Sequence, residues 1–464
     1  MKTSTHTTEL LPSTQLRKAV CGGTHQIILL LALLLGLGSA FAHANTLLMT
    51  FTNPVPSSSL FGVSVAAMGN KQVLIGSDGG ERSVVYLFST SGALLTTFTN
   101  PIAGGYGGFG SAVAAVGSDR VIVGAYDYFA GGAQVGRAFL FNTNGTLLTT
   151  FTNPSPATVQ AFGWSVNGFG SDRVMIGTAG NVAYLFRTNG ALLTTFTNPI
   201  TGPGGGFGLW LAVVGNDRVL IGAPYENTGA NGAGAAYLFQ TNGTLLMTFT
   251  NPVPASGDNF GTAMAAVGSD RLLISAIDYG GAKGNGGSAY LFSTNGTLLT
   301  TFTNPTPAAF DYFGWSVAAV GSSRVLIGAY QDSTGAFRAG STYLFSTNGA
   351  LLTTFTNPAP VAFGSFGGTV AAVGSDLVLV GAWGNGAASL FALPYPPLGI
   401  ARNGSAVSLK WTTPETGFAL QQTDALGTAT VWDDTTNSVS ITGQTNVVQQ
   451  TLVTTNRFFR LHRP

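Results

Sequence analysis

The stretch Leu-Leu-Thr-Thr-Phe-Thr-Asn-Pro at residues 94–101 recurs along the whole chain. Near-copies stand at 47–54, 147–154, 192–199, 245–252, 298–305 and 351–358, with methionine for the first threonine at 47–54 and 245–252. Each unit starts with a Phe-Gly pair and ends with this stretch, and the Phe-Gly pairs begin at positions 61, 109, 162, 207, 260, 313 and 366. The first copy of the eight-residue stretch, at 47–54, comes before the first Phe-Gly pair at 61, and no copy follows the last Phe-Gly pair at 366. The chain thus begins with the end of a unit and lacks that end in its last unit. This offset predicts a ring in which the first strand completes the last unit.

Each unit contains four candidate strands, as residues 260–305 illustrate. A run rich in small residues at 260–267 is followed by a tight turn at 268–270 and an apolar run at 271–276. A third run at 289–292 is joined through Asn295-Gly296, a strong hairpin signal, to a fourth at 298–303. Four short strands in every 45–53 residues is the period of a propeller blade, because one such sheet cannot bury both faces alone. We therefore predict an all-β chain with a seven-bladed propeller at residues 45–393, in which residues 45–54 pair beside 388–391.

The regions outside the repeat are of different kinds. Lys2, Arg17 and Lys18 precede an apolar run at 27–37 and the small-residue site Ala42-His43-Ala44, which predicts a signal peptide over residues 1–44. We expect a secreted or cell-surface protein, cleaved near Ala44, with no stable membrane span after cleavage. Residues 394–464 are predicted to be a proline-rich linker and a small C-terminal β-sandwich, because apolar residues alternate at Val407, Leu409 and Trp411 and again at Phe418 and Leu420.

Three segments carry a family resemblance. Phe-Gly-x-Ser-Val-Ala-Ala-Val-Gly at 313–321, Val-Leu-Ile-Gly-Ala-Pro at 219–224 and Gly-Ala-Ala-Tyr-Leu-Phe at 234–239 are similar to the FG-GAP repeat of integrin-alpha-type propellers. The resemblance implies a propeller and a role in adhesion. Members of that family often carry an Asp-x-Asp-x-Asp-Gly calcium loop, whereas this chain has only Gly-Ser-Asp-Arg, as at 117–120. One carboxylate on a tight turn cannot supply the six to eight oxygens that calcium prefers, so we expect no metal and no cofactor.

Composition excludes several classes of function. The four histidines are His6, His25, His43 and His462, and the one cysteine is Cys21, so residues 45–393 contain neither residue type. Zinc and copper sites, Ser-His-Asp triads and cysteine nucleophiles are therefore excluded from the propeller. The net charge is +1 with no basic block, which argues against nucleic acid as a partner. We interpret the Asp–Arg pairs at 119/120, 172/173, 217/218 and 270/271 as turn formers and solvated charges.

The two ends of the propeller are expected to differ. In a four-stranded blade the 1–2 and 3–4 turns share one end, while the 2–3 loops and the crossovers between blades share the other. The second set varies most among the seven units, and it carries eight of the thirteen acidic residues of the propeller together with a group of tyrosines. Because varied loops on a rigid scaffold suit binding, we predict a ligand surface there. The candidate residues are Tyr126, Tyr128, Tyr225, Glu226, Tyr279, Tyr312, Tyr330 and Trp383.

These features predict a non-enzymatic recognition or adhesion module that binds a polysaccharide or an extracellular protein. One alternative is a carbohydrate-active enzyme that uses two loop carboxylates, such as Asp127 and Asp332, since a glycosidase needs only two acids. Another is a structural protein of the cell envelope, whose low charge suits close lateral packing.

Overall fold

The structure is a computed structural model that describes residues 45–55, 60–79, 83–102, 107–127, 129–130, 133–156, 160–200, 205–281, 283–284, 286–393, 399–403, 406–412, 419–423, 433–435, 439–442, 445–451 and 458–462. The predicted signal peptide at 1–44 and the predicted linker at 394–398 lie outside the described residues.

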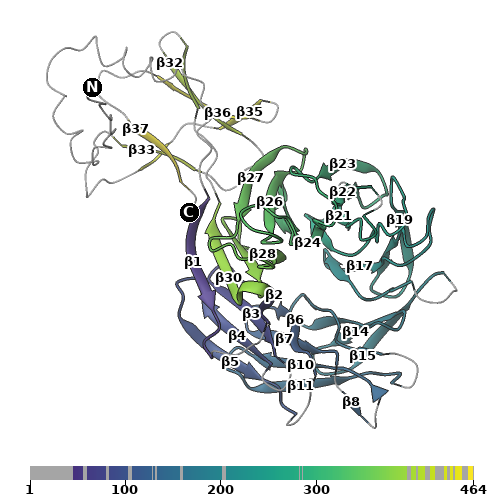
Figure 1. Ribbon diagram of the computed structural model, residues 1–464. Helices are drawn as coiled ribbons and strands as arrows, with labels where there is room; N and C mark the ends of the chain where they lie inside the picture. The colour runs from purple at the N-terminus through teal and green to yellow at the C-terminus, as the bar shows by residue number, and fades with distance from the viewer. Residues whose placement is uncertain are drawn as a thin grey trace, which may run out of the picture. The chain divides into compact units, whose positions relative to one another are not determined.

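Seven four-stranded antiparallel sheets form the propeller, and Figure 1 shows them following one another along the chain. Blades 1 to 3 comprise β2 (Leu60–Met68), β3 (Gln72–Asp78), β4 (Val84–Ser89) and β5 (Leu94–Thr99); β6 (Phe109–Val116), β7 (Arg120–Ala125), β10 (Arg137–Asn142) and β11 (Leu147–Thr152); and β12 (Val166–Phe169), β13 (Arg173–Gly177), β14 (Val182–Arg187) and β15 (Leu192–Thr197). A short hairpin of β8 (Phe129–Ala130) and β9 (Ala133–Gln134) extends blade 2.

Blades 4 to 7 repeat this order. They comprise β16 (Leu211–Val214), β17 (Arg218–Ala223), β18 (Ala235–Gln240) and β19 (Leu245–Thr250); β20 (Met264–Val267), β21 (Arg271–Ala276), β22 (Ser288–Ser293) and β23 (Leu298–Thr303); β24 (Phe313–Val320), β25 (Arg324–Ala329), β26 (Ser341–Ser346) and β27 (Leu351–Thr356); and β28 (Phe366–Val373), β29 (Leu377–Ala382) and β30 (Ala387–Ala392), with a 3-10 turn at Trp383–Asn385.

The N-terminal strand closes the ring, as the repeat offset predicts. β1 (Thr46–Thr52) pairs antiparallel with β30, with Leu47 opposite Phe391 and Phe51 opposite Ala388. Figure 1 shows this junction, where purple β1 lies beside green β30. Blade 7 is therefore built from both ends of the propeller sequence, and the predicted pairing of residues 45–54 is confirmed.

The core lies between the blades rather than inside any one of them. Seven clusters of buried apolar side chains each draw on two neighbouring blades. In the cluster across the closure, Phe51 and Leu379 of blade 7 pack with Phe61 and Ile75 of blade 1. Each Phe-Gly phenylalanine is fully buried in such a cluster. Stacking of blades thus provides the hydrophobic burial that a single sheet lacks.

Two sets of glycines let the blades approach this closely. All seven Phe-Gly glycines have φ between 85° and 96°, a left-handed conformation that glycine adopts without a Cβ clash. In six of the seven blades, the carbonyl of this glycine packs against a glycine in the second strand of the preceding blade, as the Gly261 carbonyl packs against Gly222. A Cβ at Gly222 would lie under 3.0 Å from that carbonyl oxygen, a distance that Cβ atoms do not adopt. Blade 5 differs, because Ser275 takes this place.

The turn end of the propeller is tied by side chains that reach the next blade. Arg218 donates to the carbonyl of Ser269 at 2.7 Å, and the equivalent arginines of blades 2, 3, 5 and 6 make the same bond. The neighbouring aspartates are largely exposed, whereas the arginines are about three-quarters covered. The prediction that both charges are solvated is therefore correct for the aspartates and wrong for the arginines, which join blades.

The threonines of the repeated Leu-Leu-Thr-Thr-Phe-Thr also join blades. Thr194 donates to the carbonyl of Thr241 in the next blade at 2.6 Å, and Thr96, Thr149 and Thr300 do likewise. Met247 and Met49 replace this threonine in two blades, and an added Cβ on the facing Gly296 or Gly92 would meet the methionine side chain. These contacts explain why the tail of the unit varies so little.

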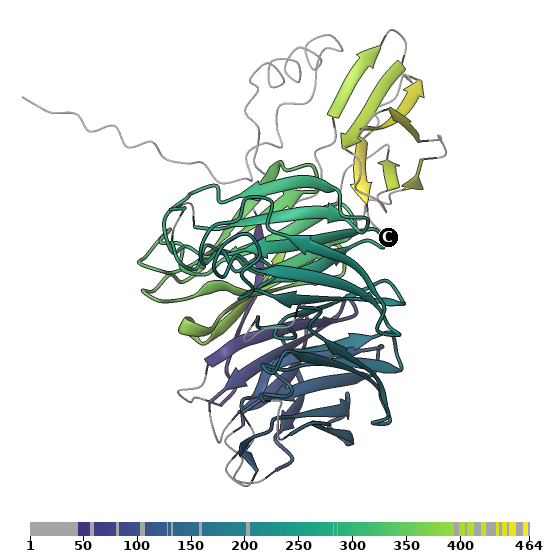
Figure 2. The ribbon, with the colours of Figure 1, turned by 90° about the vertical axis from the view of Figure 1, so that its right-hand side faces the viewer.

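The C-terminal strands form two small sheets, which Figure 2 shows in yellow-green and yellow. One contains β31 (Gly399–Asn403), β32 (Ala406–Thr412), β36 (Thr445–Thr451) and β35 (Ser440–Thr442); the other contains β34 (Asp433–Asp434), β33 (Ala419–Thr423) and β37 (Phe458–His462). Leu409, Trp411 and Val448 of the first sheet share one apolar cluster with Leu420 of the second. The predicted strand residues Val407, Leu409 and Trp411 lie in β32 and Leu420 lies in β33, whereas Phe418 lies outside the described residues.

The glycine contact between blades yields a stability prediction. We expect Gly222→Ala to lower the free energy of unfolding by about 1–3 kcal/mol, because the new methyl would press on the Gly261 carbonyl, and backbone cannot rotate away as a side chain would. Gly399→Ala is the matched control, because it also adds a methyl to a strand glycine, but to an exposed one whose new Cβ would have its nearest neighbour at 3.4 Å. Urea unfolding measures both variants. Equal losses in the two would contradict the proposed role of the contact.

Candidate functional site

The 2–3 loops and the crossovers between blades meet at one end of the propeller, as predicted. Backbone hydrogen bonds join them directly, from Tyr225 to the Gly205 carbonyl and from Gln331 to the Asp311 carbonyl. At the opposite end the 3–4 turns bond the 1–2 turns, as Thr241 does to Asp217. We call the two ends the loop end and the turn end.

Four of the predicted residues form one continuous aromatic row across blades 5 to 7. The rings of Tyr279 and Tyr312 are stacked with centroids 5.6 Å apart, and those of Tyr312 and Tyr330 are stacked at 5.5 Å. Tyr330 in turn contacts Trp383 at 5.3 Å. Trp315 packs beside the row, 4.8 Å from Tyr330. We call Tyr279, Tyr312, Tyr330 and Trp383 the aromatic row.

One end of the aromatic row faces Tyr225 of blade 4. Tyr279 and Tyr225 are 56% and 47% exposed, whereas Tyr312 at the middle of the row is 9% exposed. Burial raises the pKa of Tyr225, and the nearby phenol of Tyr279 raises it further. Burial also raises the pKa of Tyr330 to about 12. The phenols of Tyr225 and Tyr330 are therefore neutral at physiological pH and can both donate and accept hydrogen bonds.

The remaining predicted residues lie apart from the row. Tyr126 of blade 2 packs edge-on against Trp164 of blade 3 at 4.7 Å, and Tyr128 lies outside the described residues. Glu226 is only 6% exposed, and its carboxylate accepts hydrogen bonds from Asn198 and from the Tyr237 hydroxyl. This carboxylate therefore holds the loop in place from inside the protein.

Sequence reasoning missed several aromatic residues at this end. Trp164, Trp210 and Trp315 follow the Phe-Gly pair by one or two positions, and each contacts a predicted tyrosine. The first strand was interpreted from its small residues alone, although a tryptophan beside the Phe-Gly pair is a visible departure from that pattern. Phe310 belongs to the aromatic residues that the sequence places at this end but is not among the candidate ligand residues, and its ring centroid lies 6.4 Å from that of Tyr312.

One residue of the aromatic row, Tyr312, occupies a position at which the repeat has a left-handed backbone conformation. The residue before each Phe-Gly pair in blades 2 to 7 has a left-handed φ, and most blades place small residues there. These residues are Gly108, Ala161, Gly206, Asn259, Tyr312 and Ser365. Tyr312, with φ of 54°, is the one bulky side chain in that set. Such a conformation costs a non-glycine residue about 1–2 kcal/mol, so the position favours a small residue, and Tyr312 departs from it.

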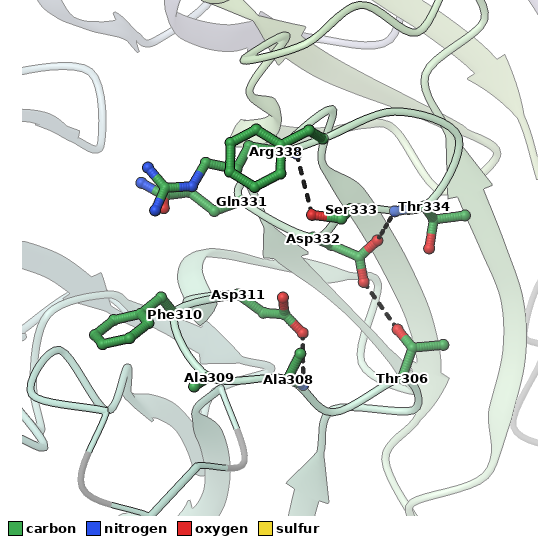
Figure 3. Close-up of a pocket in the computed structure, with 11 residues that line it drawn as sticks. Thr306, Ala308, Ala309, Phe310, Asp311, Gln331, Asp332, Ser333, Thr334 and Arg338 are labelled. Carbon is green, nitrogen blue, oxygen red and sulfur yellow. Dashed lines mark hydrogen bonds between the residues drawn. The ribbon is translucent and has the colours of Figure 1, made fainter.

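A pocket of about 450 Å³ opens between two loops next to the row. The crossover that precedes β24 forms one wall and the β25–β26 loop forms the other, as Figure 3 shows. The lining residues are Thr306, Ala308, Ala309, Phe310, Asp311, Gln331, Asp332, Ser333, Thr334, Phe337 and Arg338. Gln331 donates to the Tyr330 hydroxyl at 2.9 Å, which connects the pocket to the aromatic row.

Two carboxylates with opposite pKa shifts lie in this pocket. Burial raises the pKa of Asp311 to about 6, assisted by the nearby Asp332 carboxylate and opposed by hydrogen bonds from the Ala308 amide and Asn304. Burial also acts to raise the pKa of Asp332, but hydrogen bonds from Thr334, Thr306 and Tyr343 outweigh it and lower the pKa. Asp127, the acid that the enzyme alternative paired with Asp332, belongs to blade 2 and does not line the pocket.

In the part of the chain that the structure describes, no three His, Cys, Asp or Glu side chains lie together in a way that could hold a metal ion. Nor do the described residues include a helix long and apolar enough to cross a membrane.

The shifted pKa of Asp311 predicts a pH effect on stability. The folded chain binds this proton more tightly than the unfolded chain, whose carboxyl has the ordinary pKa of 3.8. The contribution of Asp311 to stability therefore rises as the pH falls from about 7 through 6 towards 4. Asp311→Asn keeps an acceptor for Asn304 and Ala308 but carries no charge. We expect urea unfolding at pH 7.5 and pH 5 to show a stability gain on acidification that is smaller in the variant. An equal pH dependence in both proteins would contradict the assignment.

Comparison with known proteins agrees with this architecture. Residues 300–345 match the family described as FG-GAP repeat. Among solved structures, the WD40 β-propeller domain of Doa1 is similar with a TM-score of 0.50 and 16% sequence identity, over 76% of this chain and 98% of that domain. At this identity the likeness concerns the fold. No curated protein matches the chain.

Proposed function

The chain is an FG-GAP repeat β-propeller protein, and we propose that it is an exported recognition module that binds a polysaccharide at its loop end. The observation that supports this proposal is the aromatic row, because it gathers four aromatic side chains from three blades into one surface feature. These side chains offer contact surface rather than a group that could catalyse a reaction, which favours a non-enzymatic, adhesive role.

Sugar rings suit this surface better than a flat protein epitope does. A pyranose ring has an apolar face bordered by hydroxyl groups, and tyrosine has an apolar ring with a polar tip, so the two can stack and hydrogen-bond together. Tyr225 and Tyr279 are the exposed platforms, and Tyr312 supports Tyr279 from behind. The pocket beside the row adds amide, hydroxyl and carboxyl groups next to the apolar rings of Phe310 and Phe337, so hydrogen-bonding groups and apolar surface lie together there.

The strained backbone supports the same proposal. Other blades place Gly, Ala, Asn or Ser at the left-handed position of Tyr312. A tyrosine there lowers stability relative to glycine or asparagine, so some other benefit must offset it. Alignment of Tyr279 and Tyr330 for a ligand is such a benefit.

A glycoside hydrolase is the second candidate, because Asp311 and Asp332 share a pocket and have pKa values pushed apart, as an acid and a base require. The hydrogen bonds of Asp332 argue against it. One oxygen accepts from Thr306 and Tyr343 and the other from Thr334 and Ser341, so neither is free to attack a sugar or activate water. Release of reducing ends from a glycan, lost in Asp311→Asn, would favour the hydrolase.

The proposal predicts a binding defect that leaves the fold intact. We expect Tyr225→Ala combined with Tyr279→Ala to weaken glycan binding at least tenfold, since truncation of exposed aromatic anchors removes most of their contact energy. Ile200→Ala is the matched control, because Ile200 lies on a loop-end crossover outside the row and is 50% exposed. A glycan array on residues 45–464, followed by calorimetry on the best hit, measures the effect, with thermal unfolding as the check on folding.

Two results would contradict the proposal. A hit bound equally by the double variant would place the site elsewhere. A blank array from folded protein would remove polysaccharide as the ligand, and a surface protein or self-association would then be tested.

A further inference from the structure

One wall of the pocket beside the aromatic row carries Arg338, a positively charged side chain with a left-handed backbone. Arg338 has φ of 54°, and Gly232 of blade 4, with φ of 63°, lies at the same distance before the Phe-Gly pair of the following blade. Phe310, on the opposite wall, has φ of 69°, where blade 5 has Gly257 and blade 7 has Phe363 with φ of 61°. Tyr312, Phe310 and Arg338 thus share one feature. Each is a large side chain in a left-handed conformation, and all three border the same region of blade 6.

The guanidinium of Arg338 is available to a ligand. It lies over the Phe337 ring at 5.2 Å and near the Phe363 ring at 5.8 Å, and among the described residues it forms no ion pair. Figure 3 shows its side chain extending from the upper loop of the pocket on the same side as Gln331 and Phe310. Its positive charge also acts to lower the pKa of Tyr312 and Tyr330, which places the charge near the phenols of the row.

Among the described residues, neither pocket carboxylate forms an ion pair with this cation. Asp332 accepts hydrogen bonds at both oxygens. One oxygen of Asp311 accepts from Asn304 at 2.8 Å and from the Ala308 amide at 2.9 Å. An arginine with a free planar fork is the side chain best suited to a carboxylate.

We propose that this pocket binds the carboxylate-bearing ring of an acidic polysaccharide, with the carboxylate on Arg338, while the adjoining sugars lie along the aromatic row. This inference rests on the proposed function and narrows the ligand to glycans that contain uronic acids. Phe310 and Phe337, which are 44% and 57% exposed, supply apolar surface for the sugar ring at the pocket mouth. Gln331 and Thr334 supply hydrogen-bond partners for its hydroxyl groups.

The charges around Asp311 add a pH dependence. Asp332 and Arg338 face it from the β25–β26 loop, and the Tyr343 hydroxyl bonds Asp332 from β26. Above pH 6 an ionised Asp311 repels a ligand carboxylate, whereas near pH 5 Asp311 is largely protonated and the ligand is still ionised. Binding of the acidic glycan is therefore expected to strengthen several-fold between pH 7.5 and pH 5, and the Asp311→Asn variant to lack most of that change.

The test compares two probes that differ only in charge. Oligogalacturonate and the same oligomer with methyl-esterified carboxyls are titrated by calorimetry into the mature chain, into Arg338→Gly and into Lys71→Ala. Arg338→Gly installs the residue that blade 4 has at this position, so it relieves the left-handed strain and should fold. Lys71→Ala removes one positive charge at an exposed site of the turn end and controls for net charge.

We expect the wild type and Lys71→Ala to prefer the acid at least tenfold over the ester, and Arg338→Gly to lose that preference while it still binds the ester. Equal affinity of the wild type for both probes would overturn the acidic subsite and leave the proposed function standing. A preference retained in Arg338→Gly would assign the carboxylate to another residue and overturn the pocket. Failure to bind either probe would overturn this ligand class for the pocket, and the glycan array would then decide on the proposed function itself.

Discussion

The contact between a second-strand glycine of one blade and the Phe-Gly carbonyl of the next is the constraint on which the rest of this structure depends. It occurs at six of the seven blade junctions, including the closure from Gly381 to Gly62. Because neither backbone has a Cβ at that point, the blades can approach until the phenylalanines and second-strand side chains interlock. The literal Phe-Gly and Gly-Ala elements of the repeat are therefore two halves of one interface.

The two ends of the propeller differ in how much their sequences vary from blade to blade. At the turn end, arginine and threonine side chains bond the backbone of the next blade, so the turns and the outer strands are held to one sequence. At the loop end the connections also bond from blade to blade, as the Phe260 amide does to the Ala233 carbonyl, but their lengths and residues differ. The large side chains at left-handed positions, Phe310, Tyr312, Arg338 and Phe363, all lie there, in the loops that flank blade 6. A repeat that accommodates glycine at such sites and instead holds aromatic and charged residues in this region has exchanged stability for a surface, which is the pattern expected of a binding site.

Much of the fold followed from the sequence, because the information is periodic. The strand count came from turn signals within one unit, and the closure by β1 came from the offset between the Phe-Gly pairs and the eight-residue stretches. The aromatic end was also predictable from where the copies differ. Contacts between blades were not, since the partner of Arg218 lies 51 residues away at a backbone carbonyl, which no side-chain pattern reports. The same limit explains Glu226, whose carboxylate on a varied loop resembles a ligand group in sequence but is bonded to Tyr237 inside the protein. The stacking of Tyr279 on Tyr312 requires the angle between blades, which sequence spacing does not encode.

The most direct test of this account is a paired measurement on Tyr312→Asn, which gives blade 6 the residue that blade 5 has as Asn259 at the same left-handed position. The thermal unfolding midpoint and the affinity for the best-binding glycan are measured on the same preparation. The account predicts binding at least tenfold weaker with a midpoint within a few degrees of wild type, because relief of backbone strain offsets lost stacking. An unchanged affinity together with a large fall in the midpoint would contradict it, and would show that the aromatic row braces the blades rather than binding a ligand.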